Sequence, residues 1–127
     1  VNMANEIKRL IKSFGHALQG LKFLFSSQRN AVIHLLLMFC AIVMGFLFQI
    51  SNSEWIMIIF CSALVIAAEA FNTALEKMAD AIHPDKNDGI GNAKDLAAGS
   101  VLITAIAALI VGIIIFLPKL YSWVNSI

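Results

Sequence analysis

Charged side chains are scarce in this chain of 127 residues, of which 13% are Asp, Glu, Lys or Arg and 60% are hydrophobic. Soluble domains carry about 25% charged residues, so a soluble fold would have too little polar surface to cover such a core. The formal net charge is only +1, which argues against a nucleic-acid partner, because phosphate binding needs a concentrated excess of Lys and Arg. These shortages predict an integral membrane protein.

Cysteine, histidine and the common nucleotide motifs are also rare or missing. Cys40 and Cys61 lie in apolar runs, where we expect small hydrophobes rather than a disulfide or a metal site. His34 and His83 have no second His or Cys at ligand spacing, so we expect packing or interfacial solvation for both. The lone Gly-x-Gly at 89–91 follows no strand pattern and precedes no Gly-Lys-Ser or Gly-Lys-Thr, so it supports neither a Rossmann site nor a P-loop.

Two long stretches contain no Asp, Glu, Lys or Arg. The first includes residues 31–50, which is about the length that crosses the ~30 Å hydrocarbon core of a bilayer. The second runs from Leu96 to Pro118 and starts with small residues that suit close helix packing. We expect spanning helices over about 31–50 and about 94–118, the second of them ending at Pro118.

A third apolar run is shorter and continues into polar sequence. It extends for fourteen residues, from Trp55 to Ala68. Residues typical of helices continue beyond it until Pro84, which stops a helix. We therefore expect one helix over about 55–82 whose second part leaves the membrane.

The first thirty residues have the pattern of a helix that lies on the membrane surface. Apolar residues recur at helical spacing, and basic or polar residues fall on the opposite face. The apolar positions are Ile7, Leu10, Ile11, Phe14, Leu18, Leu21 and Phe25. We expect an amphipathic helix over about 5–27, and no cleavable signal peptide, because no continuous apolar core precedes a cleavage site. With the three spans, the prediction is an all-α integral membrane protein with a single embedded domain over 1–127.

Basic residues predict the orientation in the membrane. They gather before the first span and around the loop between the second and third spans, whereas residues 51–54 have none. These basic residues are Lys8, Arg9, Lys12, Lys22, Arg29, Lys77, Lys86 and Lys94. By the positive-inside rule, we expect the N-terminus and the loop near Pro84 to face the cytoplasm.

Polar side chains form a stripe on the middle helix, within a sector of roughly 100° when each residue turns the helix by about 100°. They are Glu69, Asn72, Thr73, Glu76 and Asp80. With Trp55 at the outer boundary and a rise of ~1.5 Å per residue, Glu69 lies about 21 Å along the helix and inside the hydrocarbon core. A charge there costs at least ~2.5 kcal/mol on insertion scales, so we expect Glu69 to face protein or a water-filled cleft and to be functional. In the simpler alternative, the stripe only solvates a helix end, with Lys77 near Asp80.

A polar site that runs from inside the membrane edge into water can hold a lipid alcohol and a water-soluble reagent together. In phosphoryl transfer one carboxylate accepts the hydroxyl proton, others hold Mg²⁺, and a Lys neutralises phosphate charge. Glu69, Glu76 and Lys94 suit these roles. Two other classes stay open: a small ion or proton transporter that uses the intramembrane carboxylate, and a noncatalytic assembly protein that packs through the small residues 97–99.

A resemblance to a known family rests on two segments, EAFNTALEKMAD at 69–80 and AKDLAAG at 93–99. They closely resemble the two-part signature of the prokaryotic diacylglycerol kinase family, which includes the undecaprenol kinases. The likeness covers nearly the whole chain, including the basic amphipathic start and the three spans. It implies a homotrimer in the bacterial cytoplasmic membrane, with active sites between subunits at the cytoplasmic face.

The resemblance also implies roles for individual residues. Glu69 would be the catalytic base, with Asn72 and Asp80 as supporting polar groups. The implied contacts to ATP are Arg9, His16, Gln28, Glu76, Lys94 and Asp95. The implied metal ligands for Mg²⁺ are Glu76 and Gln28. Gln28 is a departure, because the family usually has a second metal-binding Glu there, and Gln offers only a neutral carbonyl oxygen.

The predicted reaction is the ATP- and Mg²⁺-dependent phosphorylation of a membrane lipid alcohol, from diacylglycerol to phosphatidic acid. Undecaprenol, which would give undecaprenyl phosphate, is the alternative substrate. No pocket that distinguishes the two lipids can be derived from the sequence.

Overall fold

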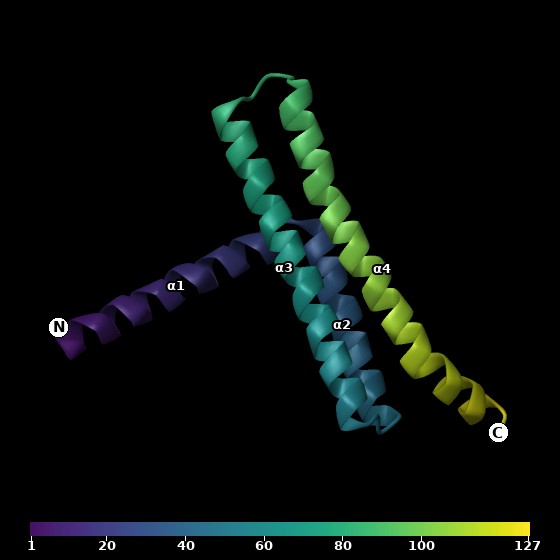
Figure 1. Ribbon diagram of the computed structural model, residues 1–127. Coiled ribbons are helices and arrows are strands. Elements are labelled where there is room, and N and C mark those ends of the chain that lie inside the picture. The colour runs from purple at the N-terminus through teal and green to yellow at the C-terminus, as the bar shows by residue number, and fades with distance from the viewer.

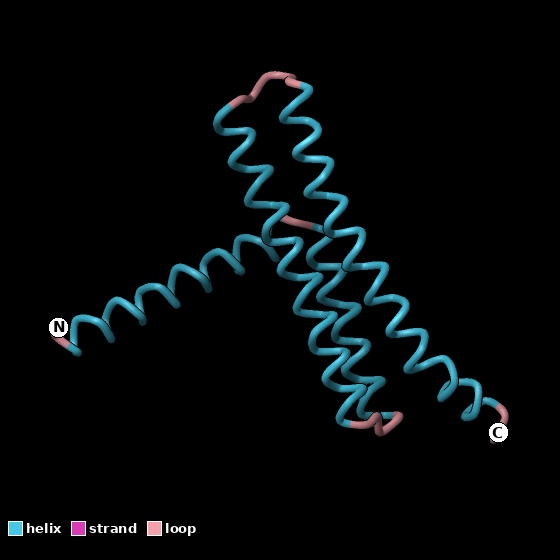
Figure 2. Tube along the Cα trace, viewed as in Figure 1, coloured by secondary structure: helices cyan, strands magenta, loops and turns pink.

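The computed structural model describes residues 1–127 and contains helices and no strands. In chain order the helices are α1 (Met3–Ser27), α2 (Arg29–Leu47), α3 (Asn52–Ile82) and α4 (Asp88–Val124). Helices α2, α3 and α4 run up and down beside one another, and α1 projects sideways from the bundle (Figures 1 and 2). The prediction of an all-α fold is confirmed.

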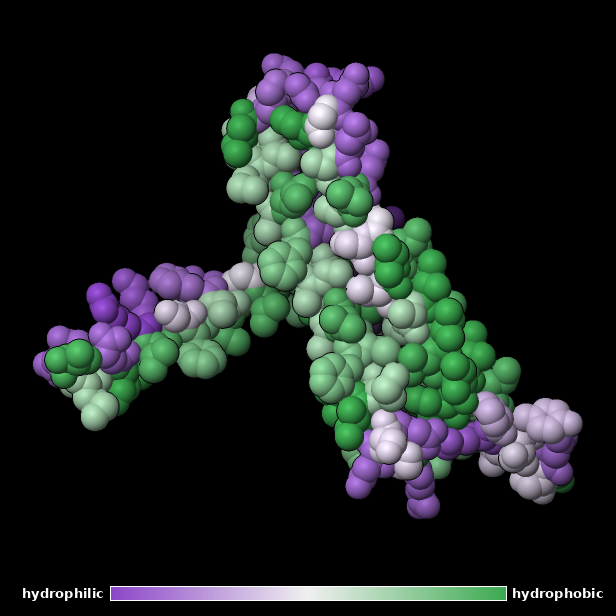
Figure 3. Space-filling model, in the orientation of Figure 1, coloured by the Kyte–Doolittle hydropathy of each residue, from purple (hydrophilic) through white to green (hydrophobic).

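Three of the helices, α2, α3 and α4, are long and apolar enough to cross a membrane. Only 10 of the 127 residues are buried within the chain. On the face of the bundle that Figure 3 shows, hydrophobic side chains predominate below the level of α1, and hydrophilic side chains gather at both ends. In water this would be a very large exposed apolar surface. The apolar surface and the three long apolar helices therefore both agree with the expected multi-pass membrane fold.

The surface of α1 is divided between two sides. Figure 3 shows a hydrophilic side that is turned away from the apolar part of the bundle and a hydrophobic side that is turned toward it. Apolar side chains on this helix are highly exposed, as at Ile11 (67%), Phe14 (70%) and Leu18 (65%). The amphipathic helix that the sequence predicted over about 5–27 is therefore present as α1, and a helix of this kind suits the membrane interface.

One residue forms the corner between α1 and α2. Gln28 has an extended backbone, with φ −114° and ψ 107°, and it both caps the end of α1 and precedes the start of α2. Its N–H donates to the carbonyl of Leu24, which closes the last turn of α1. Leu24 is 2% exposed, so the chain changes direction around a buried apolar side chain.

Two ion pairs join α3 and α4 at opposite ends. At the end near the α2–α3 loop, Lys119 Nζ lies 2.8 Å from Glu54 Oε2. At the end near the α3–α4 loop, Lys94 pairs with Asp80. The pairs are 26 residues apart on α3 and 25 apart on α4, about 38 Å at ~1.5 Å per residue. The two helices are therefore antiparallel and keep one register over a length greater than the ~30 Å hydrocarbon core.

Helix α4 extends beyond its expected bounds at both ends. It begins at Asp88, because the side chain of Asn87 accepts a hydrogen bond from the N–H of Ile90 at 3.1 Å and caps the first turn. It also continues through Pro118 to Val124, although the sequence predicted an end at Pro118. Proline removes one backbone donor and so disrupts the helix locally, and the residues after it resume helical hydrogen bonding.

The buried apolar cluster of the bundle lies near the α2–α3 loop and includes Ile50, Ile58, Ile115 and Phe116. Trp55 packs at its edge and covers Gly45 on α2. A Cβ atom on Gly45 would lie 2.6 Å from Cη2 of Trp55 and 3.1 Å from Cδ1 of Ile50. Gly45 is therefore required by the close approach of the indole ring.

This close approach leads to a prediction for stability. We expect Gly45→Ala to destabilise the protein by about 1–3 kcal/mol through overpacking, seen as a lower Tm in detergent micelles. Gly112→Ala is the matched control, because a Cβ on Gly112 meets nothing within 4 Å, and Ala is the better helix former. A Tm for Gly45→Ala equal to or above that of the Gly112 variant would contradict the packing described here.

Candidate active site

The buried line of α3 changes from apolar to polar along the helix. Its members are Ile58, Val65, Glu69 and Thr73. Spacings of seven and four residues keep these side chains on one helix face. Glu69 and Thr73 are each 3% exposed, so a carboxyl and a hydroxyl take positions where the earlier turns of the same helix have Ile and Val.

Glu69 faces α2. Its Oε1 lies 3.4 Å from Nε2 of His34, and no aligned hydrogen bond reaches this oxygen. Ala31, one turn before His34, is fully buried, and such a small residue lets two helices approach closely. The expectation that Glu69 faces protein or a cleft is consistent with this position.

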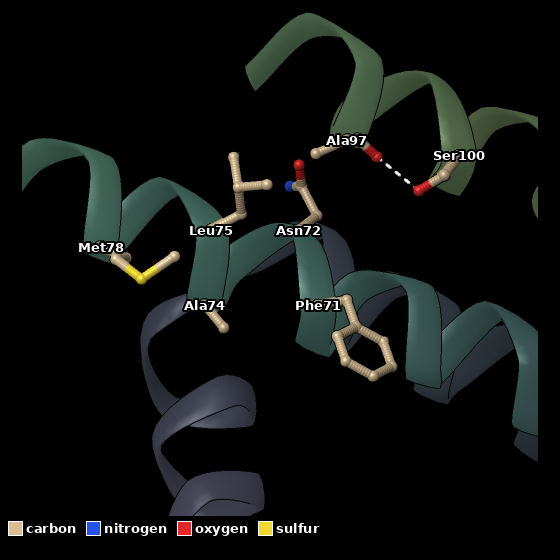
Figure 4. A pocket seen from close by; sticks show the side chains of 7 residues that line it. All are labelled: Phe71, Asn72, Ala74, Leu75, Met78, Ala97 and Ser100. Atoms are coloured by element: carbon tan, nitrogen blue, oxygen red, sulfur yellow. Dashed lines mark hydrogen bonds between the residues drawn. The ribbon is translucent and has the colours of Figure 1, made fainter. Parts of the chain in front are cut away.

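Asn72 and Glu76 form the next part of the stripe. Asn72 Nδ2 donates to Glu76 Oε1 at 3.5 Å. The Asn72 side chain points from α3 towards Ala97 of α4 and lines a hollow of about 310 Å³ between these helices (Figure 4). The Oδ1 atom of Asn72 is buried and has no hydrogen-bond partner, and the same holds for Oγ1 of Thr73. Buried polar atoms without partners are rare in folded chains and often mark functional positions.

The stripe ends at the α3–α4 loop with an ion pair. Asp80 pairs with Lys94 across the two helices, and both side chains are partly exposed. Lys77, which the sequence had placed near Asp80, lies instead over the ring of Phe23 on α1, with Nζ 5.8 Å from the ring centroid. The stripe therefore contacts three helices. Glu69 faces α2, Thr73 lines a hollow next to α1, and Asn72 and Asp80 face α4.

The remaining expected site residues make no hydrogen bond or ion pair with the stripe within one chain. Arg9 pairs with Glu6 of its own helix at 3.1 Å, and the N-terminal half of α1 extends away from the bundle (Figure 1). His16 is exposed on α1, and Asp95 is exposed on α4. Gln28 donates to Ser27 at 3.4 Å and has no hydrogen bond with Glu76.

Sequence reasoning missed the role of one residue in this site, His34. His34 was expected to serve packing or interfacial solvation, and its contact with Glu69 was not foreseen. The available signal was its position inside an apolar span, where an ionisable side chain usually has a partner and a function. Its partner could not be identified, because helical spacing does not fix how two helices are rotated against each other.

The site thus combines a buried carboxylate within a spanning helix, unpartnered polar atoms beside it and a cation near the loop. Such a set can accept a proton at its deep end and hold charged phosphate groups at its polar end. The fold is that of a small multi-pass membrane protein, and this set of side chains suits phosphoryl transfer at a membrane surface.

Comparisons with known proteins identify the family. The sequence model of the prokaryotic diacylglycerol kinase family matches residues 15–116 of this chain. The undecaprenol kinase of Bacillus subtilis is 38% identical over 117 residues, which cover 91% of this chain and 94% of that protein. A diacylglycerol kinase of Synechocystis is 37% identical over 114 residues, covering 89% and 65%. That of Haemophilus influenzae is 34% identical over 109 residues, covering 85% and 89%.

The chain therefore belongs to the prokaryotic diacylglycerol kinase family. It is a lipid kinase, with a lipid substrate and ATP as the co-substrate. The predicted enzyme class is confirmed, and the transporter and assembly-protein alternatives are set aside.

Proposed function

We propose that this kinase transfers the γ-phosphoryl group of ATP to the hydroxyl of a membrane lipid alcohol, with Glu69 as the catalytic base. The lipid oxygen forms a bond to phosphorus, the bond to the ADP oxygen breaks, and the hydroxyl proton goes to the Glu69 carboxylate. The observation that carries this proposal is the burial of Glu69, 3% exposed within a spanning helix, at a cost that function explains.

The lipid would approach from the membrane beside α1. A hollow of about 350 Å³ lies between α1 and α3, lined mostly by apolar groups such as Gly20, Leu24 and Ala70. Thr73 also lines it, one helical turn from Glu69. An acyl or prenyl chain suits the apolar part of this hollow, and a hydroxyl suits its polar end.

The nucleotide would bind at the polar end of the stripe. Lys94 and Asp95 lie near the start of α4, and Lys94 is already held beside Asp80. Because phosphoryl transfer depends mainly on positioning and electrostatics, a cation on the phosphates and polar groups around them supply most of what the protein must add. Arg9, His16, Gln28 and Glu76 complete the proposed ATP contacts.

The oxygen atoms near Glu76 fit a magnesium ion. Mg²⁺ takes oxygen ligands and is commonly bound by one or two carboxylates together with substrate phosphates and water. Glu76 provides a carboxylate, and Asn72 Oδ1 is a buried oxygen without a partner. No group of three His, Cys, Asp or Glu gathers in the chain, so phosphate oxygens would complete the set. When bound, Mg²⁺ would neutralise charge on the phosphates.

The working unit would be a homotrimer in the bacterial cytoplasmic membrane, with the site facing the cytoplasm. Neither Arg9 nor Gln28 forms a hydrogen bond with Glu76 within one chain, and Asn72, whose Oδ1 has no partner, lines a hollow on the bundle. A second subunit that brings its α1 to this hollow would complete the site. The basic residues on α1 and near the α3–α4 loop support the cytoplasmic orientation.

For the lipid we propose a polyprenol such as undecaprenol. Support comes from the undecaprenol kinase relative, which is similar over 94% of its own length. Diacylglycerol is the second candidate, because a relative at 37% identity is a diacylglycerol kinase. Initial rates in mixed micelles with each lipid as the sole acceptor separate them. We expect the higher kcat/KM with the polyprenol, and a higher value with diacylglycerol would reverse the assignment.

Gln28 gives a separate prediction about the metal. We expect Gln28→Glu to lower the Mg²⁺ concentration for half-maximal activity, because a carboxylate binds Mg²⁺ better than a neutral amide oxygen. Activity is measured over a Mg²⁺ titration at saturating ATP. Ser26→Glu, on an exposed position two residues away that has no hydrogen bond with Gln28, controls for added negative charge. An unchanged metal dependence would remove Gln28 from the proposed metal site.

A further inference from the structure

His34 is the one nitrogen-bearing side chain of α2 beyond Asn30. It lies five residues after the start of the helix, and its side chain is 22% accessible. An imidazole in an apolar span loses its hydration, and this loss is costly unless a polar partner replaces the water. The position of His34 therefore requires an explanation beyond packing.

The partner is the buried carboxylate of the proposed catalytic base. His34 Nε2 and Glu69 Oε1 are 3.4 Å apart, and the Glu69 side chain is only 4% accessible. Val65, which is one turn before Glu69 on the same face of α3, is buried and has an apolar side chain that cannot bind Oε1. No aligned hydrogen bond reaches Oε1, so the imidazole is the polar group that can take it. Catalytic hydrogen bonds are often long without substrate and shorten in the complex.

We propose that His34 is a positioning residue that holds Oε1 of Glu69 through its Nε2–H, so that Oε2 faces the lipid hydroxyl. The proposal rests on the function given above, in which the Glu69 carboxylate accepts the hydroxyl proton, and it assigns that proton to Oε2. His34 keeps its own proton throughout and touches neither lipid nor ATP. Its contribution is orientation, since a base must be held within about 0.5 Å of productive geometry and is commonly fixed by a third group.

Two kinds of substitution separate positioning from packing. His34→Leu and His34→Phe remove the donor and suit an apolar span, whereas His34→Gln keeps an N–H donor. We expect both apolar variants to lower kcat by about 10- to 100-fold, as loss of an orienting partner does at metal and catalytic sites, with the KM for ATP nearly unchanged. We expect His34→Gln to recover most of the loss. Cys40→Leu, an exposed position on the same helix, controls for a new apolar side chain.

A double substitution tests the coupling directly. When Glu69 is already replaced by Gln, we expect His34→Leu to cause almost no further loss of kcat, because residues that act as a unit are not additive. A structural role would give the same loss in both backgrounds. If one apolar variant does not fold, the other is used, with Tm in micelles as the check.

The outcomes distinguish this inference from the function on which it rests. Wild-type protein that phosphorylates no lipid would overturn the proposed function. Active wild-type protein whose folded His34→Leu or His34→Phe variant retains full kcat would overturn the role of His34 alone. A His34→Gln variant as impaired as the apolar variants, or a loss seen only in the KM for ATP, would also overturn it.

Discussion

Glu69→Gln is expected to lower kcat for lipid phosphorylation by roughly 10²- to 10⁴-fold, the usual contribution of a general base. The KM for ATP should stay nearly the same, because the nucleotide is proposed to bind farther along the stripe. The Tm should not fall, because the substitution removes a charge that is costly to bury and keeps the size of the side chain. The measurement is the initial rate of lipid phosphate formation in mixed micelles, with Tm recorded on the same samples.

Glu54→Gln is the matched control for this experiment. Glu54 is on the same helix, but it lies at the opposite end and pairs with Lys119. Gln can still serve the capping box that Glu54 forms with Ser51. We expect nearly full activity from this variant. Equal activity in the Glu69 and Glu54 variants would remove Glu69 as the base and require another acceptor for the proton.

Lys94→Ala is expected to reduce kcat/KM for ATP by about 10²-fold, which is typical when one stabilising group for transition-state charge is lost. Lys94 lies near the start of α4 with 34% of its side chain accessible, so it can reach a phosphate while it remains beside Asp80. The loss should appear in a titration of ATP at saturating lipid. Lys86→Ala, on the exposed α3–α4 loop, is the control for loss of one positive charge.

A charge exchange separates a phosphate role for Lys94 from a purely structural one. In the double variant Asp80→Lys with Lys94→Asp, the ion pair between α3 and α4 can re-form with the charges reversed. We expect the Tm to recover towards that of the wild type while kcat/KM for ATP stays low, because the cation no longer stands at its proposed place. Recovery of both values would mean that the pair only joins the helices.

The periodic features of the fold could be predicted from the sequence. The length of the apolar runs predicted α2 and α4, because about 20 apolar residues are needed to cross a bilayer. Helix α3 was predicted from a shorter apolar run that continues with residues typical of helices until Pro84. The spacing of Phe14, Leu18 and their apolar neighbours predicted which side of α1 is hydrophobic. The stripe from Glu69 to Asp80 follows from helical geometry alone, since one helix fixes which of its own residues share a face.

The contacts between helices could not be predicted in the same way. Helical spacing does not give the rotation of α2 against α3, so His34 could not be assigned to Glu69. Asp80 has Lys77 three residues before it, a usual distance for an ion pair on one helix, yet it pairs with Lys94. The antiparallel register of α3 and α4 places Lys94 there, and Lys77 lies over Phe23 instead. The contributions of Arg9, His16 and Gln28 remain predictions for the assembled enzyme.

The most direct measurement follows the γ-phosphate itself. Purified protein in mixed micelles is incubated with γ-labelled ATP and Mg²⁺ together with either a polyprenol or diacylglycerol, and the lipids are extracted and separated. We expect label in a lipid monophosphate with wild-type protein, at a rate that falls at least about 100-fold with Glu69→Gln. Folded wild-type protein that leaves all label in ATP or inorganic phosphate, with both lipids, would contradict the assignment of this membrane carboxylate to lipid phosphorylation.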